Sequence, residues 1–271
     1  MPELPEVQTV IAELRSLIIG KCIRKIETLW NKTLVNRSQK SLEGQCIWDI
    51  LRKGKYLIFP LNESYLIIHL RMTGRLSFAP SGASRIEKEQ NLNHVRLIIH
   101  FSDGSRLLFD DTRKFGRVYH VDNVREFLQH VGRDALNGQW TPEEFYKKLH
   151  GRKTGIKAWL MSQRFISGLG NIYTDESLFR ANIHPERPAS SLTPEEARRL
   201  FDAIRFILQQ AIENMGSTIS DYRDAYGNPG KNQNYFKVYK REGKPCFVCG
   251  TPILKKRVAG RSTRFCPQCQ R

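Results

Sequence analysis

The first residues of the chain bring an amine and two carboxylates to one end of a predicted helix. The sequence opens Met1-Pro2-Glu3-Leu4-Pro5-Glu6-Val7, and removal of Met1 would leave Pro2 with a secondary amine as its free N-terminus. A neutral amine can attack an electrophilic carbon, and a carboxylic acid such as Glu3 or Glu6 can deliver the proton that the reaction needs. On local features alone, a proline-capped helix start with no catalytic role is the commoner explanation.

Four cysteines near the end of the sequence have the spacing of a metal site. Two residues separate Cys246 from Cys249 and Cys266 from Cys269, and sixteen residues separate the two pairs. Four thiolates in two such turns match a closed, tetrahedral structural zinc site. The basic residues between the pairs, which include Arg261, favour a hairpin that faces a phosphate backbone. The pattern predicts one zinc ion that serves folding and not catalysis.

A glycine-rich connector between two predicted helices is a candidate phosphate site. Ser167-Gly168-Leu169-Gly170-Asn171 would place backbone N–H groups and the Asn171 amide at a helix N-terminus. Arg152, Lys153 and Lys157 lie directly upstream and strengthen this interpretation. Taken alone, an ordinary helix connector and a solvated basic face are the commoner explanations.

Two further turns carry residues that could enter a stack of bases. Met72 lies in Arg71-Met72-Thr73-Gly74, and Arg113 and Phe115 lie in Asp111-Thr112-Arg113-Lys114-Phe115-Gly116. An apolar wedge and a phenyl ring could fill a gap in the stack while the guanidinium hydrogen-bonds an orphaned base. Without other evidence, packing beneath a loop would be preferred for Met72 and Phe115.

A predicted helix and a set of predicted strands must position the residues near the start of the chain. The periodic apolar residues Val7, Val10, Ile11, Leu14, Leu17 and Ile18 predict an opening helix that ends before Gly20. Short β-branched or aromatic runs predict strands at 45–51, 56–61, 65–70, 95–101, 106–109 and 117–121, with turn signals at Lys53-Gly54, Asn62-Glu63 and Asp103-Gly104. Such short links favour an antiparallel β-sandwich.

The middle of the chain is predicted to be helical. Thr141 and Thr193 each begin a Thr-Pro-Glu-Glu capping box, and helices are expected at 156–165, at 172–180 and from 194 to Gly216. We expect an α+β fold of three domains: a β-sandwich with its opening helix over 1–132, a helical domain with a polar loop at 217–234 over 133–234, and a zinc ribbon over 235–271.

Charge and composition limit the partners. The 271 residues include 44 Lys and Arg against 27 Asp and Glu, which gives a net charge of +17. Such a charge favours nucleic acid ahead of an acidic membrane, and no run approaches the ~20 apolar residues of a membrane helix. Without a signal layout the chain is expected in the cytosol. Cys22 and Cys46 are isolated in the sequence, and disulfides are not expected in a reducing compartment.

Five motifs in one order resemble a known family over essentially the whole chain. They are Pro2 to Val7, Ile68-His69-Leu70-Arg71-Met72-Thr73-Gly74, Asp111 to Gly116, Gly170-Asn171-Ile172-Tyr173 and the four-cysteine ribbon. Together they resemble the bacterial formamidopyrimidine-DNA glycosylases of the helix-two-turn-helix family, which remove 8-oxoguanine and formamidopyrimidines from duplex DNA. The resemblance implies a monomeric bifunctional glycosylase and abasic-site lyase, nucleoid-associated in the bacterial cytosol.

The resemblance also implies roles for individual residues. Pro2 would attack C1′ and form an iminium, from which β- and δ-elimination follow, while Glu3 would protonate the sugar and Glu6 would assist transfers near C1′. Lys55 would meet the damaged nucleotide and its phosphate, and Asn171 and Arg261 would contact phosphates, Arg261 also acting in the later elimination. The remaining DNA contacts implied are His69, His94, Arg113 and Lys153.

Departures from the family pattern leave alternatives open. Gln8 stands in place of a common glutamate, Gly132-Arg133-Asp134-Ala135-Leu136 alters the interdomain link, and residues 228–234 alter the loop that covers the flipped base in the family. An enzyme that prefers oxidised pyrimidines is the first alternative, although Leu4, Met72, Arg113 and Phe115 favour purines. A non-catalytic zinc-ribbon lesion binder is the second.

Overall fold

The computed structural model describes residues 1–82, 92–136, 140–219 and 222–271. They form two compact units, unit 1 with Met1–Gln129 and Asn214–Lys231, and unit 2 with His130–Glu213 and Asn232–Arg271. Of the predicted helical domain, 137–139 lie outside the described residues, as do 220–221 of the predicted loop at 217–234. The segment 214–231 belongs to unit 1, although it follows the last helix of unit 2 in the sequence.

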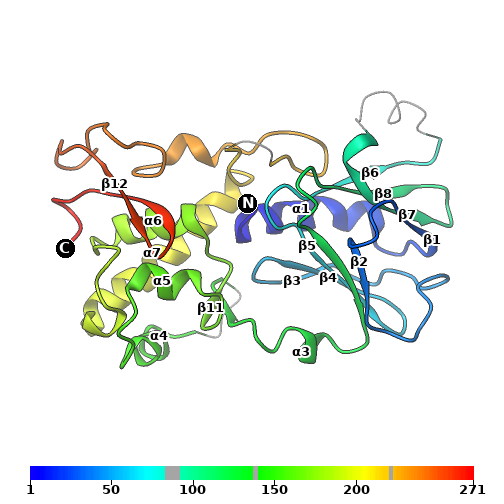
Figure 1. Ribbon diagram of the computed structural model, residues 1–271, viewed down its shortest axis with the longest axis horizontal. Coiled ribbons are helices and arrows are strands. Elements are labelled where there is room, and N and C mark those ends of the chain that lie inside the picture. The colour runs from blue at the N-terminus through cyan, green and yellow to red at the C-terminus, as the bar shows by residue number, and fades with distance from the viewer. Residues whose placement is uncertain (83–91, 137–139, 220–221) are drawn as a thin grey trace. The chain divides into compact units, whose positions relative to one another are not determined.

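Unit 1 begins with the predicted helix, α1 (Leu4–Ile18), which has a proline in its first turn. Its periodic apolar residues, among them Val10, Leu14 and Ile18, are buried in a core that also receives side chains from two β-sheets. Figure 1 shows α1, in blue, running alongside the strands of this unit. The core therefore holds the helix start, and with it Pro2, in a fixed place within unit 1.

The two sheets confirm the predicted sandwich. One has the order β1 (Ile23–Thr28), β7 (Val95–Phe101), β8 (Arg106–Asp110), β6 (Arg75–Ala79), and the other β2 (Leu34–Asn36), β9 (Arg117–Val121), β5 (Tyr65–His69), β4 (Tyr56–Pro60), β3 (Leu51–Lys53). All neighbours are antiparallel except β2 and β9, which are parallel. The short elements η1 (Leu92–His94) and α3 (Val124–Phe127) complete the regular structure described here.

The predicted strand at 45–51 is wrong in most of its length. Only Leu51 belongs to a strand, and Cys46 makes a single isolated antiparallel bridge with Cys22. The same two residues are joined by a disulfide across 24 positions of sequence, which corrects the expectation that the chain forms no disulfide. The two cysteines lie side by side because the backbones around them pair: Ile23 N–H donates to Gln45 O, and Ile47 N–H donates to Lys21 O. Sequence spacing does not reveal this pairing.

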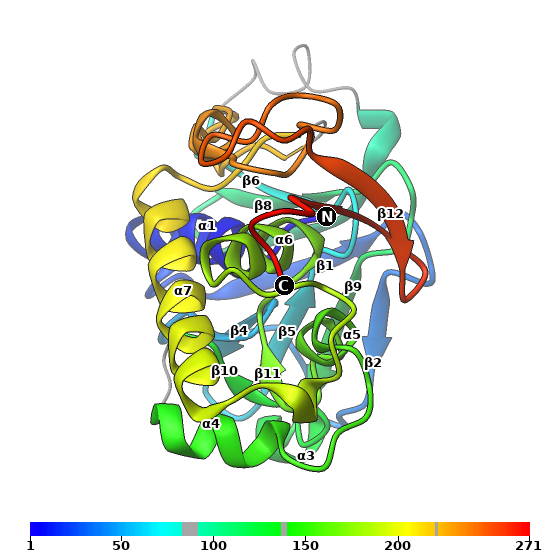
Figure 2. The same cartoon turned by 90° about the vertical axis from the view of Figure 1, so that its left-hand side faces the viewer.

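Unit 2 contains four predicted helices, α4 (Pro142–Leu149), α5 (Ile156–Met161), α6 (Asn171–Arg180) and α7 (Pro194–Glu213). Two of them end earlier than predicted, since α5 was expected to reach residue 165 and α7 to reach Gly216. Both capping boxes form, with Glu144 N–H donating to Thr141 Oγ1 and Glu196 N–H to Thr193 Oγ1. Figure 2 shows α7, in yellow, beside α6, against which it packs. The remaining elements are β10 (Arg133–Asp134), β11 (Ile166–Ser167), η2 (Ala189–Ser191), η3 (Asn232–Tyr235) and the hairpin β12 (Leu254–Val258) with β13 (Arg261–Phe265).

A membrane span is not found in the part of the chain that the structure describes, where every helix is too short or too polar to cross a bilayer.

Candidate active site

The carboxylates at the start of α1 are buried and engaged with backbone groups. Glu3 and Glu6 are each only 2% exposed, and they form a reciprocal capping box in which Glu3 N–H donates to Glu6 Oε2 at 2.8 Å. The other oxygen of Glu6 accepts from Ser217 N–H at 2.7 Å. Pro2 is buried beside them. The structure thus brings Pro2, Glu3 and Glu6 together, with Glu6 holding the backbone on both sides.

Gly216 makes this contact possible. Its φ is +73°, and a Cβ added there would lie 2.9 Å from the Glu6 side chain. A left-handed backbone with no room for a side chain requires glycine. The turn after α7 therefore approaches the Glu6 carboxylate closely enough for Ser217 N–H to bind it.

Lys55 lies near the same helix, at the turn between β3 and β4. Arg52 links the turn to α1, since its Nε donates to Gln8 Oε1 at 2.7 Å and its guanidinium also donates to Gly54 O at 3.3 Å. Lys55 itself is buried. Gln8 therefore serves as the acceptor that ties the lysine-bearing turn to the start of α1.

His69 is held as a neutral, oriented imidazole. Burial, together with the nearby charges of Arg71 and Lys55, lowers the pKa of His69 to about 3. Its Nδ1 accepts from Arg71 N–H at 2.9 Å, so that the ring proton resides on Nε2. Tyr56 packs edge-on against the ring at 4.6 Å. At neutral pH the ring can donate from Nε2 without carrying charge.

Asp111 joins the two turns that carry the predicted base-stack residues. Its Oδ1 accepts from the Thr73 hydroxyl and from Arg113 N–H at 3.2 Å, and its Oδ2 accepts from Gly116 N–H at 2.7 Å. Gly116 lies so close to the core that an added Cβ would meet the Phe109 ring at 2.4 Å. One buried carboxylate therefore fixes both turns.

The side chains on these turns are exposed. Met72 is 39% and Phe115 49% exposed, and the Arg113 guanidinium lies 5.0 Å from the Phe115 ring. Large apolar side chains held out in water by a rigid turn are available to a partner. This arrangement disfavours the alternative that Met72 and Phe115 pack beneath a loop.

His94 lies beside the same turn. Its backbone oxygen accepts from Asp111 N–H at 2.9 Å, and Arg96 Nε donates to Asp111 O at 2.8 Å. The imidazole Nδ1 is 3.4 Å from the Arg96 guanidinium. The structure therefore gathers His94 with Met72, Arg113 and Phe115, within unit 1.

Lys157 does not belong to the exposed basic cluster with which the sequence grouped it. Its side chain is 0% exposed and its Nζ donates to Asp175 Oδ1 at 2.6 Å and to Thr263 Oγ1 at 2.7 Å. Arg152 and Lys153 are exposed, as expected of residues that contact phosphate. Lys157 is instead a structural cation that ties α5 and α6 to the β12–β13 hairpin.

Asn171 and Arg261 come close together through the same hairpin. Asn171 opens α6, and its Nδ2 donates at 2.8 Å to the backbone oxygen of Ser262, the neighbour of Arg261. The Asn171 Oδ1 is buried without a hydrogen bond in the described residues. Arg261 is exposed where β13 begins, beside a hollow of about 450 Å³ lined by Lys255, Lys256, Arg257, Gly260 and Ser262. This basic surface suits a phosphate backbone.

The four predicted cysteines converge. Their sulfurs all lie within 4.8 Å of one another, which fits a tetrahedral zinc ion, whose thiolates are roughly 3.8 Å apart for Zn–S bonds near 2.3 Å. Val248 N–H and Cys269 N–H each point at a ligand sulfur at 3.4 Å, the kind of backbone contact that orients thiolates. The donor set has no open position, in keeping with a structural role.

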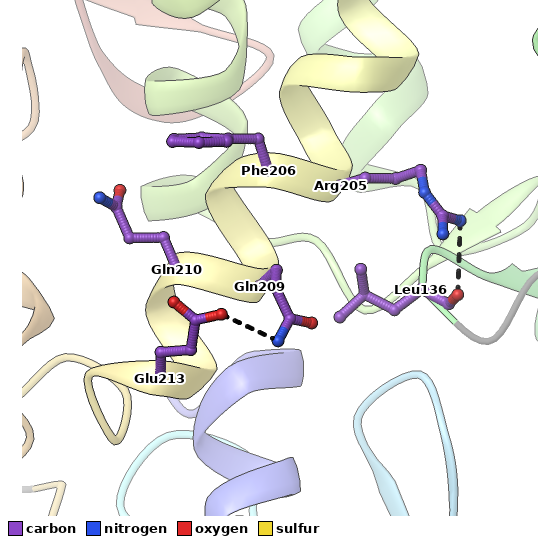
Figure 3. Close-up of a pocket in the computed structure, with 6 residues that line it drawn as sticks. All are labelled: Leu136, Arg205, Phe206, Gln209, Gln210 and Glu213. Atoms are coloured by element: carbon purple, nitrogen blue, oxygen red, sulfur yellow. Dashed lines mark hydrogen bonds between the residues drawn. The ribbon is translucent and has the colours of Figure 1, made fainter.

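A second hollow, on α7, lacks the run of basic residues that lines the hollow at the β12–β13 hairpin. It measures about 380 Å³ and is lined by Leu136, Arg205, Phe206, Gln209, Gln210 and Glu213. Figure 3 shows Arg205 directed at the backbone oxygen of Leu136 and Gln209 at Glu213. These lining residues include none of the predicted site residues, so the candidate site rests on the groups described above.

Two positioning residues escaped the sequence analysis. Asp111 was noted only as the first residue of a turn, although an aspartate that begins an Asp-x-x-x-x-Gly turn commonly accepts backbone N–H groups. Asp175 was missed because a single acidic residue in a helix carries no signal of burial. Burial raises the pKa of Asp175 to about 6, against the opposing effect of Lys157.

Known families match all three parts of the chain. The family models described as Formamidopyrimidine-DNA glycosylase N-terminal domain, Formamidopyrimidine-DNA glycosylase H2TH domain, and Zinc finger found in FPG and IleRS match residues 1–118, 131–223 and 243–271. The zinc-finger match and the converging sulfurs confirm the predicted structural zinc ion.

Individual relatives match over the full length. A formamidopyrimidine-DNA glycosylase from Symbiobacterium thermophilum is 42% identical over 100% of this chain and 89% of its own. Lactococcus lactis FPG is 38% identical in two solved complexes that cover 100% of both chains, a mutant with Fapy-dG-containing DNA (TM-score 0.89) and the wild type with DNA containing an oxidised pyrimidine (TM-score 0.88). The chain belongs to the formamidopyrimidine-DNA glycosylases, a family of bifunctional DNA glycosylases and abasic-site lyases.

Proposed function

We propose that this protein removes oxidised purines, among them 8-oxoguanine and formamidopyrimidines, from double-stranded DNA and then cleaves the abasic strand. The observation that carries the proposal is the start of α1, where Pro2, Glu3 and Glu6 are buried together and both oxygens of Glu6 hold backbone N–H groups. Full-length similarity to relatives solved with damaged DNA supports the substrate.

The proposed chemistry begins with removal of Met1, which frees the Pro2 nitrogen as a secondary amine. That nitrogen attacks C1′ of the damaged nucleotide as the C1′–base bond breaks, and the proton that the nitrogen gives up goes to the departing base. Glu3 then protonates the sugar oxygen as the ring opens. The resulting iminium has no N–H to lose and stays cationic, which acidifies the C2′ proton. Its removal expels the 3′ phosphate, and a second elimination expels the 5′ phosphate.

The other residues are given the roles that the family resemblance implies. Glu6 holds Glu3 in place and assists proton transfer near C1′, and Lys55 meets the damaged nucleotide and its phosphate. Met72, Arg113 and Phe115 fill the vacated stack and offset the few kcal/mol that flipping a base costs. The proposed phosphate and DNA contacts are His69, His94, Lys153, Asn171 and Arg261, with Arg261 also acting in the second elimination.

A preference for oxidised pyrimidines is the second candidate. A relative at 38% identity has been solved with DNA that contains an oxidised pyrimidine, which supports oxidised pyrimidines as the alternative substrate. The exposed Met72, Arg113 and Phe115, all held by one carboxylate, favour the purine assignment.

We also propose that the protein works as a monomer in the bacterial cytosol, at the nucleoid.

Borohydride trapping tests the proposal directly. The purified protein, with removal of Met1 checked by intact mass, is incubated with duplexes that carry 8-oxoguanine, an oxidised pyrimidine or an abasic site. Reduction of the iminium should give a covalent adduct with the 8-oxoguanine and abasic duplexes, and Glu3→Gln should form less of it. A processed protein that forms no adduct would refute the Pro2 mechanism, and equal rates for both base classes would refute the purine preference.

A further inference from the structure

The segment after α7 is docked on the catalytic helix at two points. This docked segment comprises the described residues 214–219 and 222–230, all in unit 1. Its first point is the bond from Ser217 N–H to Glu6. Its second point lies two helical turns further along α1, where Ala225 N–H donates to Glu13 Oε2 at 2.6 Å. Glu6 and Glu13 are seven residues apart and therefore share one face of the helix.

Apolar packing reinforces the second point. Ala225 is buried in the core of unit 1, and Tyr222 packs against the same core. Asp224 organises the turn at residues 224–228, since its Oδ1 accepts from Tyr226 N–H at 3.0 Å and from Asn228 N–H at 2.7 Å. The docked segment is thus a folded loop that meets α1 through Glu13.

The Glu13 carboxyl is electrostatically unusual for a half-buried group. Burial raises the pKa of Glu13 to about 7, and the charge of Asp224 and a hydrogen bond to it contribute, although the Ala225 N–H opposes the shift. Tyr222, whose own pKa is raised chiefly by burial and further by Glu6 and Glu13, faces the same place. A protonated Glu13 can bind Asp224, whereas an ionised one repels it.

We propose that Glu13 is a positioning residue for base removal, because it holds the docked segment whose first residues bind Glu6 beside Pro2 and Glu3. The proposal rests on the proposed function. Base release depends on the surroundings of the base, whereas elimination at a preformed abasic site has no base to recognise. Loss of docking should therefore slow the first reaction and spare the second.

The pH dependence follows from the two states of the segment. Glu13 has a pKa near 7 when the segment is docked and an ordinary value near 4.3 when it is released. The docked state therefore binds more protons, so docking is strongest below about pH 4.3 and weakens until about pH 7, above which it changes no further. A glutamine at position 13 would keep both hydrogen bonds at every pH, through its oxygen to Ala225 N–H and its amide N–H to Asp224.

The experiment compares the wild-type protein with Glu13→Ala, Glu13→Gln and, as a matched control, Glu43→Ala, which removes an exposed carboxylate of the same unit. Single-turnover rates are measured at pH 5 to 8.5 on a duplex with 8-oxoguanine and on one with a preformed abasic site. Amide hydrogen exchange of the peptide that contains Ala225 reports docking without reference to activity.

Glu13→Ala should slow base release about tenfold, the effect of losing one good contact, with abasic cleavage within about twofold of wild type and faster exchange at Ala225. The ratio of Glu13→Gln to wild-type base release should rise between pH 5 and 7.5, whereas Glu43→Ala should match wild type throughout. Unchanged exchange in Glu13→Ala, equal slowing of both substrates or a flat Gln-to-wild-type ratio would overturn the inference. A wild-type protein without base release would refute the proposed function, and the exchange data would still decide whether Glu13 docks the segment.

Discussion

Replacement of Lys157 by methionine should destabilise unit 2 far more than an ordinary lysine substitution. The Lys157 Nζ and the Asp175 carboxylate are both wholly buried and 2.6 Å apart. The pKa of Asp175 is already about 6 because of burial, and Lys157 opposes the rise. Without the lysine, the carboxylate is left uncompensated in the interior and its pKa must rise further.

The expected loss is about 3–5 kcal/mol of unfolding free energy at pH 8, the usual result of removing one partner from a buried ion pair. In the wild-type protein this carboxyl favours the unfolded state increasingly as pH rises from 3.8 to about 6. In Lys157→Met the pKa of Asp175 in the folded state is higher, so the pH range over which this carboxyl increasingly favours the unfolded state extends above pH 6. The difference between variant and wild type should therefore grow by up to about 1.4 kcal/mol per pH unit above pH 6.

Urea unfolding can measure this loss in unit 2 alone. Substituting Trp30 and Trp48 by phenylalanine leaves Trp140 and Trp159, which lie in unit 2, as the fluorescent reporters. Zinc must be held at one concentration, because its release is coupled to unfolding. Lys148→Met, at an exposed position of α4, should change stability by less than about 0.5 kcal/mol.

A Lys157→Met loss below about 1 kcal/mol, or the same loss at pH 6 and pH 8, would refute the assignment of a charged buried pair. The double variant Lys157→Met/Asp175→Leu should recover part of the loss, since replacing both partners by apolar groups removes the unpaired charge. Thr263 loses a partner in both cases, so recovery should not be complete.

Four further predictions follow from individual contacts. Asp111→Ala should lower base release at least about tenfold with a smaller effect at a preformed abasic site, because it frees two turns at once. The His69 ring should show no NMR titration between pH 5 and 8, and since its folded pKa lies near 3 it should destabilise the fold as pH falls below 6.5. Cys249→Ser, or a strong zinc chelator, should unfold the ribbon and weaken DNA binding, while unit 1 keeps its melting behaviour. Thiol labelling of the unfolded chain should gain two sites after reduction, those of Cys22 and Cys46.

Features set by local sequence could be predicted from it. The helix α1 has apolar side chains at 3.6-residue spacing, and the Thr141 and Thr193 boxes need only residues three positions apart. The zinc ligands were found because two short spacings encode the geometry of the two turns. In each case the recognisable pattern lies within a few neighbouring residues, even though the two cysteine pairs are themselves sixteen residues apart.

Features that depend on partners far away in the sequence could not be predicted from it. The strand β1 escaped because Arg24, Lys25 and Glu27 interrupt its apolar residues, and it is fixed by pairing with β7. Lys157 looked like a phosphate contact because nothing near it in sequence announces that it is buried with Asp175, eighteen residues later. The pairing of Cys22 with Cys46 likewise depends on the path of the chain between them.

The acidic residues of α1 illustrate why the start of this helix depends on the segment after α7 as much as on its own sequence. In a chain of net charge +17, three glutamates lie along this helix or at its cap, and two of them accept backbone N–H groups from the docked segment. A helix N-terminus favours such carboxylates, and Glu6 uses one oxygen for Glu3 N–H and the other for Ser217 N–H. Glu3, whose N–H is held by Glu6, follows the proline whose amine is proposed to react. Displacement of the docked segment would therefore free one oxygen of Glu6, whereas the bond from Glu3 N–H to the other oxygen lies within the helix start and would remain.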